Sequence, residues 1–319
     1  MDMDQRSIVL AKSGKAAAVT VLITAAFLFI SGTSAFPQNK SAEKQESAGD
    51  LLRKAVAGEL KAQSDDHSHW MYQTKTKDST KEQVKWIVET GSGDLDRLWS
   101  VNGRPITREL QKKEDQRIKH FLHTPGEQKK QQRAQQADAR QTEQLFKMLP
   151  DAVTVKFGEH KDGLVEILFQ PNRNFRPSTH EAAVFHAMEG RIWINEKNNR
   201  LAEIDGHLLR PVKFYGGMLG HLDEGGTFHV KQSEVAPGYW EVTVLQVNMH
   251  GKALFFKTIS VQQNEVRSNF QRVPDNLTLA QAAEELQKQC AAQTTAQRHG
   301  QVSLVAALDH AQSIGKEEQ

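Results

Sequence analysis

The segment between Pro150 and Pro274 constrains the fold most, because nearly all of it favours β-strands. Runs such as 164–171 and 239–251 are rich in β-branched and aromatic residues, and short polar or glycine-containing turns separate such runs. No helical pattern lies between consecutive strands here, so the βαβ units that build parallel sheets are not expected. The sequence therefore predicts one large antiparallel sheet.

A helix and three more strands are predicted before this segment. From Asp50, a plausible N-cap, apolar residues recur at helical spacing as far as Leu60. Strand candidates follow at 69–77, 82–90 and 95–103, separated by the turns "DSTK" and "GSGD". Strands joined by such short polar turns form an antiparallel meander.

Two helices are predicted between this meander and the later strands. Residues 104–149 are dominated by Glu, Gln, Lys, Arg and Ala, and Pro125 with Gly126 marks a break. A last helix is predicted after Pro274, from the segment "PDNLTLAQAAEELQKQ". The order of elements predicts an α+β fold: a large antiparallel sheet with helices and an inserted charged helical pair.

The chain divides into four parts by composition. Residues 1–35 resemble a signal peptide, 36–48 are a polar linker, 49–290 form a single domain with the helical insert at 104–149, and 291–319 are a tail that the pattern leaves unassigned. A single domain is expected because strand patterns continue on both sides of the insert.

The N-terminus predicts export. Arg6, Lys12 and Lys15 precede an apolar run of about 15 residues, shorter than the roughly 20 that span a bilayer, and small residues follow up to Ala35. We therefore expect a cleaved signal peptide and a periplasmic protein, with an uncleaved membrane anchor as the alternative. A net charge of only +2 gives the whole chain no attraction to nucleic acid.

The histidines do not form a recognisable metal motif. His180 and His186 in "HEAAVFH" are six residues apart, not the four that place two ligands on one helix face. On a strand they lie nearly 20 Å apart at about 3.3 Å per residue, too far for one ion. Convergence on adjacent strands stays open for His207, His221, His229 and His250. We expect no metal and no cofactor.

Catalytic motifs are also missing from the sequence. It contains no G-x-S-x-G elbow and no phosphate-binding glycine loop. Cys290, the only cysteine, has no partner for an intrachain disulfide and no activating context, so we expect a small buried apolar residue. The chain is therefore predicted not to be an enzyme, with no catalytic residues.

The segment "FYGGMLGHLDEGGTFHV" predicts a bent hairpin. Strands at 213–222 and 227–232 flank the turn "DEGG", where Gly225 or Gly226 takes a positive φ. Glycines inside the first strand, from Gly216 onward, permit bulges and bending that curl a sheet. A phosphate-binding loop needs the N-terminus of a following helix, and no helix follows here. We therefore attribute the glycines of this segment to curvature of the sheet.

Several of these segments resemble a known family. The strand–turn–strand "MEGRIWINEKNNRL", the glycine-bearing hairpin and "GYWEVTV" resemble exported bacterial envelope proteins whose fold is similar to that of the lipoprotein-sorting proteins LolA and LolB. The resemblance covers roughly residues 50 to 290. It implies an unclosed antiparallel half-barrel wrapped around helices, with an apolar cavity that accepts lipid or acyl chains in the better-known relatives. The long charged helical pair departs from a minimal sorting chaperone.

Non-covalent binding of a lipid or other amphiphile, as carrier or sensor, is the leading hypothesis. The expected lining residues are Trp193, Phe214, Met218, Phe228 and Trp240. All five tryptophans fall in predicted strands, where they either fill a core or line a cavity, and the sequence does not separate these outcomes.

Two other hypotheses belong to different classes. In one, the sheet is a scaffold and residues 104–147, with eleven basic and six acidic residues, dock on an envelope protein or an anionic membrane. Deleting 107–147 is then expected to leave the sheet folded. The other is a histidine-dependent metalloenzyme.

Overall fold

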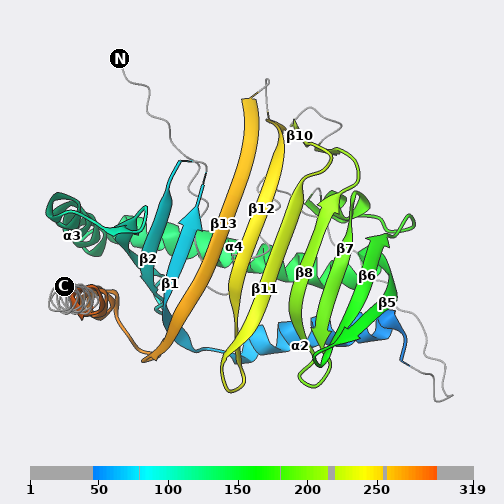
Figure 1. Ribbon diagram of the computed structural model, residues 1–319, viewed down its shortest axis with the longest axis horizontal. Helices are drawn as coiled ribbons and strands as arrows, with labels where there is room; N and C mark the ends of the chain where they lie inside the picture. The colour runs from blue at the N-terminus through cyan, green and yellow to red at the C-terminus, as the bar shows by residue number, and fades with distance from the viewer. Residues whose placement is uncertain (1–45, 79, 180, 215–219, 254–256, 293–319) are drawn as a thin grey trace, which may run out of the picture.

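The structure, a computed structural model, describes residues 46–292 except 79, 180, 215–219 and 254–256. A single sheet of 13 strands runs in the order β4-β3-β2-β1-β13-β12-β11-β8-β7-β6-β5, with β10 paired to β12 and β9 to β10 (Figure 1). Neighbouring strands pair antiparallel, and the two ends of the sheet, β4 and β5, do not pair with each other. The predicted α+β fold with an unclosed half-barrel is therefore confirmed.

The strands are short at the edges and long in the middle of the sheet. They are β1 (His69–Lys77), β2 (Glu82–Val88), β3 (Leu95–Val101), β4 (Arg104–Pro105), β5 (Val153–Lys161), β6 (Leu164–Pro171), β7 (Met188–Asn195), β8 (Arg200–Leu208), β9 (Val212–Phe214), β10 (Gly220–Leu222), β11 (Thr227–Ala236), β12 (Tyr239–Ala253) and β13 (Lys257–Val273). The helices are α2 (Ala48–Asp65), α3 (Arg108–Leu122), α4 (Pro125–Ala152), the 3-10 helix η1 (Glu181–His186) and a C-terminal helix over residues 279–292.

Helix α2 begins earlier than the sequence predicted. Ser47, and not Asp50, is the N-cap: the Ser47 hydroxyl accepts a hydrogen bond from the Asp50 backbone N–H. The Asp50 carboxylate in turn accepts one from the Ser47 backbone N–H at 3.3 Å, which completes a capping box. An acidic residue is common both at the N-cap and three residues after it. The sequence pattern alone therefore placed the start of α2 too late.

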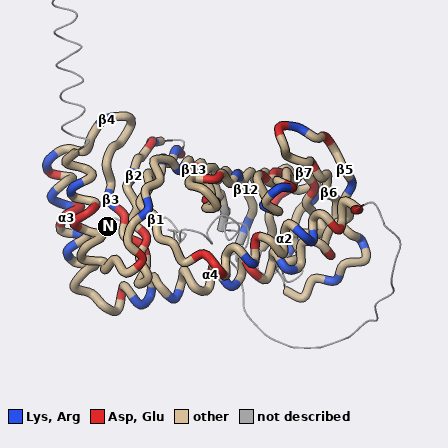
Figure 2. The backbone as a smooth tube through the Cα atoms, turned by 90° about the horizontal axis from the view of Figure 1, so that it is seen from below, with Lys and Arg blue, Asp and Glu red and all other residues tan. Residues whose placement is uncertain are grey.

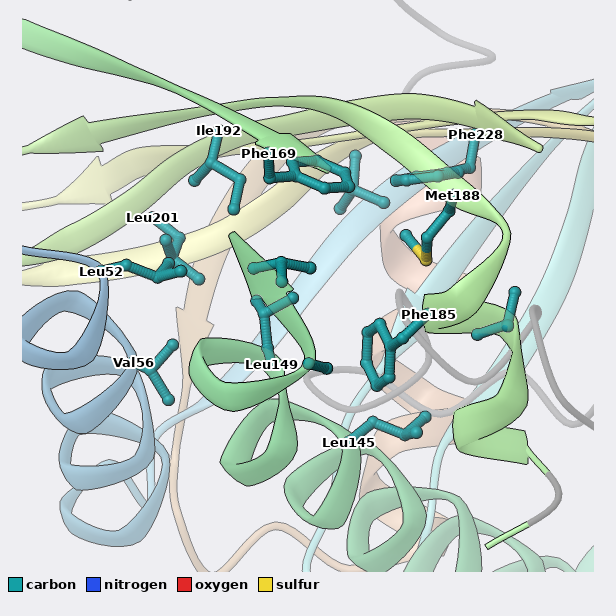
Figure 3. Close-up of a cluster of buried hydrophobic side chains, with 14 of the residues drawn as sticks. Leu52, Val56, Leu145, Leu149, Phe169, Phe185, Met188, Ile192, Leu201 and Phe228 are labelled. Carbon is teal, nitrogen blue, oxygen red and sulfur yellow. The ribbon is translucent and has the colours of Figure 1, made fainter. Parts of the chain in front are cut away.

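Helices α2 and α4 cover one face of the sheet, here called the helix face (Figure 2). Their apolar side chains meet those of strands β5 to β8, β11 and β12 in one cluster, and Figure 3 shows α2 contributing Leu52 and Val56 and α4 contributing Leu145 and Leu149. Phe169 and Ile192, from the sheet, are 1% and 0% exposed. This cluster is the main hydrophobic core.

Helix α4 is thus part of the core rather than a separable insert. Leu145 and Leu149 are 3% and 4% exposed, and Thr142 and Ala152 are also buried. The expectation that the sheet stays folded without residues 107–147 conflicts with this packing, because the deletion would uncover the apolar surface of β5 to β8.

Among the described residues, helices cover the opposite face of the sheet at the β1–β3 end. There α3 and the C-terminal helix pack on Met71, Trp86 and Val88, which alternate along their strands with residues of the helix face. Ile118 from α3 and Leu286 from the C-terminal helix are buried in this cluster. The two ends of the sheet therefore carry cores on opposite faces.

The glycine-rich hairpin differs from its prediction. Residues 213–222 do not form one strand, because β9 and β10 pair antiparallel with each other, Phe214 opposite Gly220. β9 and β10 are therefore two separate strands, and residues 215–219 lie outside the described part of the chain. The predicted turn is confirmed, with Gly225 at φ +79°.

Candidate ligand cavity

A cavity of about 440 Å³ lies on the helix face of the sheet. Its walls come from the C-terminal halves of α2 and α4, and from strands β8, β11 and β12 with the turn at Pro237 and Gly238. It borders the main core, where α2 ends and the helices leave part of the sheet uncovered. The volume is within the range of about 300–1,000 Å³ common for small-molecule sites.

One wall of the cavity is largely apolar and aromatic. α2 contributes Leu60 through the same helical spacing that buries Val56, and α4 contributes Phe146 one turn from Thr142. Further apolar lining residues come from strands: Leu201, Ile204, Val230, Tyr239, Trp240 and Val242. Such a surface suits an alkyl or ring group more than a charged one.

An ion pair closes one side of the cavity. The Arg200 guanidinium donates to both carboxylate oxygens of Glu59, at 2.8 and 3.1 Å, and the two side chains are only 13% and 11% exposed. The Leu201 backbone N–H donates to the same carboxylate at 2.7 Å, so Glu59 ties α2 to β8. Arg200 also lies 5.6 Å from the centre of the Trp240 ring, a cation–π contact that holds the indole in place.

The β11–β12 turn brings a second aromatic group to the rim of the cavity. Tyr239 packs edge-on against Trp70 of β1, with ring centres 5.6 Å apart, and accepts a hydrogen bond from Arg272 of β13 at 2.7 Å. Tyr239, the first residue of β12, therefore contacts side chains of both β1 and β13. These contacts anchor Tyr239 at the edge of the cavity.

Beyond this rim the helix face becomes polar. Arg267 donates to Glu265 at 2.8 Å, lies 5.5 Å from the centre of the Tyr72 ring, and is almost fully buried with both partners. Burial raises the pKa of Tyr72 well above its usual value, although Arg267 opposes this. Burial alone would lower the pKa of Arg267, but Tyr72, Glu265 and Glu89 outweigh it and raise that pKa. Arg267 is therefore charged at neutral pH, and this buried polar cluster limits the apolar part of the interior.

The predicted lining residues fall in different places. Trp240 lines the cavity, whereas Phe228 is 4% exposed and belongs to the packed core. Trp193 is half-buried and follows Ile192 in β7, so it lies on the face away from the helices. Phe214 ends β9 but its side chain, like all of Met218, is outside the described part of the chain. The role of all five residues as ligand contacts stays a prediction.

The other three tryptophans are core residues. Trp70, Trp86 and Trp99 are 2%, 1% and 7% exposed. They pack in the two smaller clusters at the β1–β3 end, not around the cavity.

A second, larger hollow of about 810 Å³ lies on the opposite face of the sheet, over β5 to β8 and β11. Charged and polar side chains lie side by side in it: Arg191 donates to Asp205 at 2.8 Å, and the His229 ring lies 3.0 Å from Glu203. Because charged groups would have to lose their hydration, this groove suits an apolar ligand less than the cavity between helices and sheet.

The histidines do not converge on a metal-binding group in the described residues. His207 lies 3.5 Å from Glu189 and His221 lies 3.1 Å from Asp223, each beside a single carboxylate. His250 contacts Ser260 at 3.1 Å instead. The metalloenzyme hypothesis therefore has no structural support within that part of the chain, and His180 lies outside it.

Cys290 is half-buried against the cluster formed by α3 and the C-terminal helix. Burial raises the pKa of its thiol to about 11, against the opposing charge of Arg97. The thiolate is therefore scarce at neutral pH, which makes this side chain a poor nucleophile.

Sequence reasoning missed most of the cavity. Glu59 and Arg200 are 141 residues apart, and neither stands in a motif that marks a partner. Phe146 belongs to the helical insert, from which no lining residue was expected. The only local signal was the apolar spacing of α2, in which Leu60 continues the buried stripe.

No helix among the described residues combines the length and apolar character needed to cross a membrane. The predicted signal peptide, residues 1–35, and the tail beyond residue 292 lie outside the described part. Comparisons of the chain with protein-family models, with curated proteins and with solved structures find no match. The cavity and its side chains are therefore the basis for a functional proposal.

Proposed function

We propose that this protein binds a lipid or other amphiphile non-covalently, as a carrier or sensor in the bacterial envelope. The observation that carries the proposal is the half-open interior: an unclosed sheet whose helix face holds a cavity of about 440 Å³ beside an apolar and aromatic wall. The bound molecule places its apolar part against Leu60, Phe146 and Trp240, and its polar part at the rim.

The hydrophobic effect is large enough to drive such binding. Burying about ten methylene groups contributes about 8 kcal/mol at about 0.8 kcal/mol each. The loss of translational and rotational freedom costs about 4 kcal/mol or more. The remainder of about 4 kcal/mol corresponds to a dissociation constant of about 1 mM, and each further buried methylene group tightens binding about fourfold.

Co-purifying material and a blocked cavity together test the proposal. Solvent extraction and mass spectrometry of the purified protein are expected to reveal an amphiphile, and the emptied protein is expected to bind a fluorescent fatty-acid analogue. In Ala62→Trp a large side chain replaces a small lining residue and fills part of the cavity, and we expect binding at least about tenfold weaker. Ala57→Trp, on the exposed side of the same helix, is the matched control and should bind normally.

A second pair of variants separates the two faces of the sheet. Trp240→Ala removes a cavity wall and is expected to weaken binding, whereas Trp193→Ala, on the other face, is not. A protein that carries no amphiphile and ignores the fatty-acid analogue, or equal effects of the two substitutions, would contradict the proposal.

Docking of α4 on an anionic membrane is a second candidate. Lys129, Arg133 and Arg140 are exposed and follow one line along the helix at spacings of four and seven residues. Each basic residue near an anionic surface contributes about 1 kcal/mol. The same outer surface is available to an acidic envelope protein.

Surface substitution tests this candidate, since deletion of α4 would remove core residues. The triple variant Lys129→Glu, Arg133→Glu and Arg140→Glu is expected to lose co-sedimentation with vesicles containing phosphatidylglycerol while keeping its circular dichroism spectrum. Unchanged co-sedimentation, or no vesicle binding by the parent protein, would exclude it.

A further inference from the structure

The face of the sheet that turns away from α2 and α4 carries a long polar groove, on the side toward the viewer in Figure 1. Two hollows of about 810 and about 430 Å³ form it, and they share Thr227, Phe228 and His229. The first lies over β5 to β8 and β11, and the second continues over β12 and β13. Because neighbouring strands lie about 4.8 Å apart, a groove across these strands is on the order of 30 Å long.

Strand register places a row of polar side chains along this groove. Residues directly opposite each other in antiparallel strands point to the same face of the sheet. The first row, from β6 to β13, consists of Gln170, Glu189, His207, Thr227, Asn248 and Gln262. Every one of these side chains is at least partly exposed, so the row is open to solvent.

A second polar row runs beside the first and is held by its own contacts. It consists of Arg191, Asp205, His229, Gln246 and Asn264. The Arg191 Nε–H donates to the Asp205 carboxylate at 2.8 Å, and the two side chains are 51% and 25% exposed. The Arg191 Nη1 atom lies 4.0 Å from Glu166, beyond hydrogen-bonding distance. The pair is thus fixed in place, yet its terminal N–H groups and carboxylate lone pairs can bind a further partner.

Charges in the groove are balanced rather than of one sign. The lining contains four carboxylates and three cations: Asp78, Glu189, Glu203 and Asp205, against Lys77, Lys156 and Arg191. A polyanion such as nucleic acid needs an excess of cations. The centre of a protein interface needs aromatic or large apolar anchors, and the two rows contain neither. The groove therefore complements an uncharged, polar ligand.

The side-chain types suit the hydroxyl groups of sugars. Amides, imidazoles and hydroxyls both donate and accept hydrogen bonds, as a sugar hydroxyl does. Asn248, Gln262 and Asn264 are exposed and make no side-chain hydrogen bond to another described residue. Trp193 lies two residues beyond Arg191 in β7, on the same face and half-buried, beside Glu203 of β8. Its ring offers a flat apolar surface to the C–H face of a sugar.

We infer that this groove binds a linear, uncharged oligosaccharide that lies across the strands. Its hydroxyl groups hydrogen-bond to the two rows, and paired side chains such as Arg191 and Asp205 are already oriented for this. The site lies on the face away from the amphiphile cavity. Sugar binding is therefore a separate activity, independent of the proposed function.

Three linear, uncharged hexasaccharides test this inference by calorimetry: maltohexaose, cellohexaose and hexa-N-acetylchitohexaose. We expect at least one to bind, and its disaccharide to bind at least about tenfold more weakly because it reaches fewer strands. The affinity should be unchanged in about 0.5 M salt, since the ligand has no charge to be screened. Heparin, a polyanionic sugar chain, should not displace it.

Two matched double variants connect binding to the groove. Asn248→Ala with Asn264→Ala removes one amide from each row, and we expect binding of the hexasaccharide to weaken about tenfold or more. Gln136→Ala with Gln144→Ala removes two exposed amides from α4 and is the control, with unchanged affinity. All four positions are exposed, so both variants should keep the circular dichroism spectrum of the parent protein.

Each other outcome would overturn the inference. If none of the three hexasaccharides binds, the groove is not a sugar site. Displacement by heparin would show that it prefers a polyanion. Equal affinity of the parent protein and the Asn248, Asn264 variant would place the sugar elsewhere on the molecule. None of these results bears on the amphiphile cavity, which is tested by variants on the helix face.

Discussion

Gly190 and Gly206 face each other across β7 and β8, where the backbones approach too closely for any side chain. A Cβ atom on Gly190 would lie 2.0 Å from the Asp205 carbonyl oxygen, and one on Gly206 would lie 2.9 Å from the Phe228 ring. Paired glycines with an aromatic ring over them permit a sheet to bend strongly. These two residues therefore help to curve the sheet around α2 and α4.

Replacing Gly190 should destabilise the fold even with the smallest side chain. We expect Gly190→Ala to lower the free energy of unfolding by about 2–3 kcal/mol, because the obstructing atoms belong to the backbone. Gly126→Ala, in the first turn of α4 with open space around it, should be neutral or slightly stabilising. Urea unfolding followed by circular dichroism measures both, and equal midpoints would show that the close approach has no cost.

Helix α4 meets two environments along its length. Its C-terminal half buries Leu145 and Leu149 in the main core, whereas its N-terminal half presents polar residues, and the Gln131 side chain donates to the Asp94 carbonyl at 2.9 Å. Burial raises the pKa of Asp138, which lies between these halves. The helix thus changes from apolar to polar packing near the cavity, and its C-terminal half should carry most of its contribution to stability.

Leu149→Ala is expected to lower the free energy of unfolding by about 2–4 kcal/mol, the cost of a cavity in a packed core. Gln144→Ala, at an exposed position of the same helix, should change it by less than about 0.5 kcal/mol. Urea unfolding of the two variants provides the comparison. A small effect of Leu149→Ala would mean that α4 packs loosely and is dispensable for the sheet.

The attachment of α3 to β3 depends on pH. Glu114 accepts hydrogen bonds from Arg117 and from the Leu98 backbone N–H. Burial alone would raise the pKa of Glu114, but these bonds outweigh it and lower that pKa. Folding therefore favours the ionised carboxylate, whose contribution is complete above about pH 4.3, the unfolded value, and is lost as pH falls through the lower folded value.

Glu114→Gln should remove this contribution, on the order of 1 kcal/mol at pH 7. It should also flatten the loss of stability between about pH 5 and pH 3. Urea unfolding at pH 7, 5, 4 and 3 tests both, with the exposed Glu159→Gln as control. An unchanged pH profile in Glu114→Gln would contradict the assignment.

At the scale of the whole molecule, one sheet joins cores that lie on opposite faces. β12 and β13, of 15 and 17 residues, run between the end covered by α2 and α4 and the end covered by α3 and the C-terminal helix. β13 pairs with β12 through residues 257–266 and with β1 through residues 265–273. Long shared strands couple the two ends, so neither should unfold alone.

We therefore expect one cooperative unfolding transition. In the double variant Trp193→Phe, Trp240→Phe, fluorescence reports only Trp70, Trp86 and Trp99 at the β1–β3 end, while far-ultraviolet circular dichroism reports the whole sheet. The two signals should have the same urea midpoint. A fluorescence transition that precedes the circular dichroism transition would show that the β1–β3 end is an independent unit.

Local patterns were enough to predict most elements. β1 and β6 have the bounds expected from their alternation and flanking turns, and the break at Pro125 is where α4 begins. The errors lie where two local interpretations compete. Ser47 and Asp50 both suit the start of α2, and the strand-like pattern of residues 213–222 did not show that β9 and β10 are separate strands.

The sequence by itself determined the α+β class, the antiparallel sheet and the order of helices and strands, because turns and side-chain periodicity act over a few residues. Only the tertiary structure decided that β1 pairs with β13, that α4 enters the core, and that Glu59 meets Arg200 across 141 residues. The cavity is made of such distant contacts. Whether a tryptophan fills a core, as Trp86 does, or lines a cavity, as Trp240 does, depends on which distant segments cover it, and no local pattern carries that information.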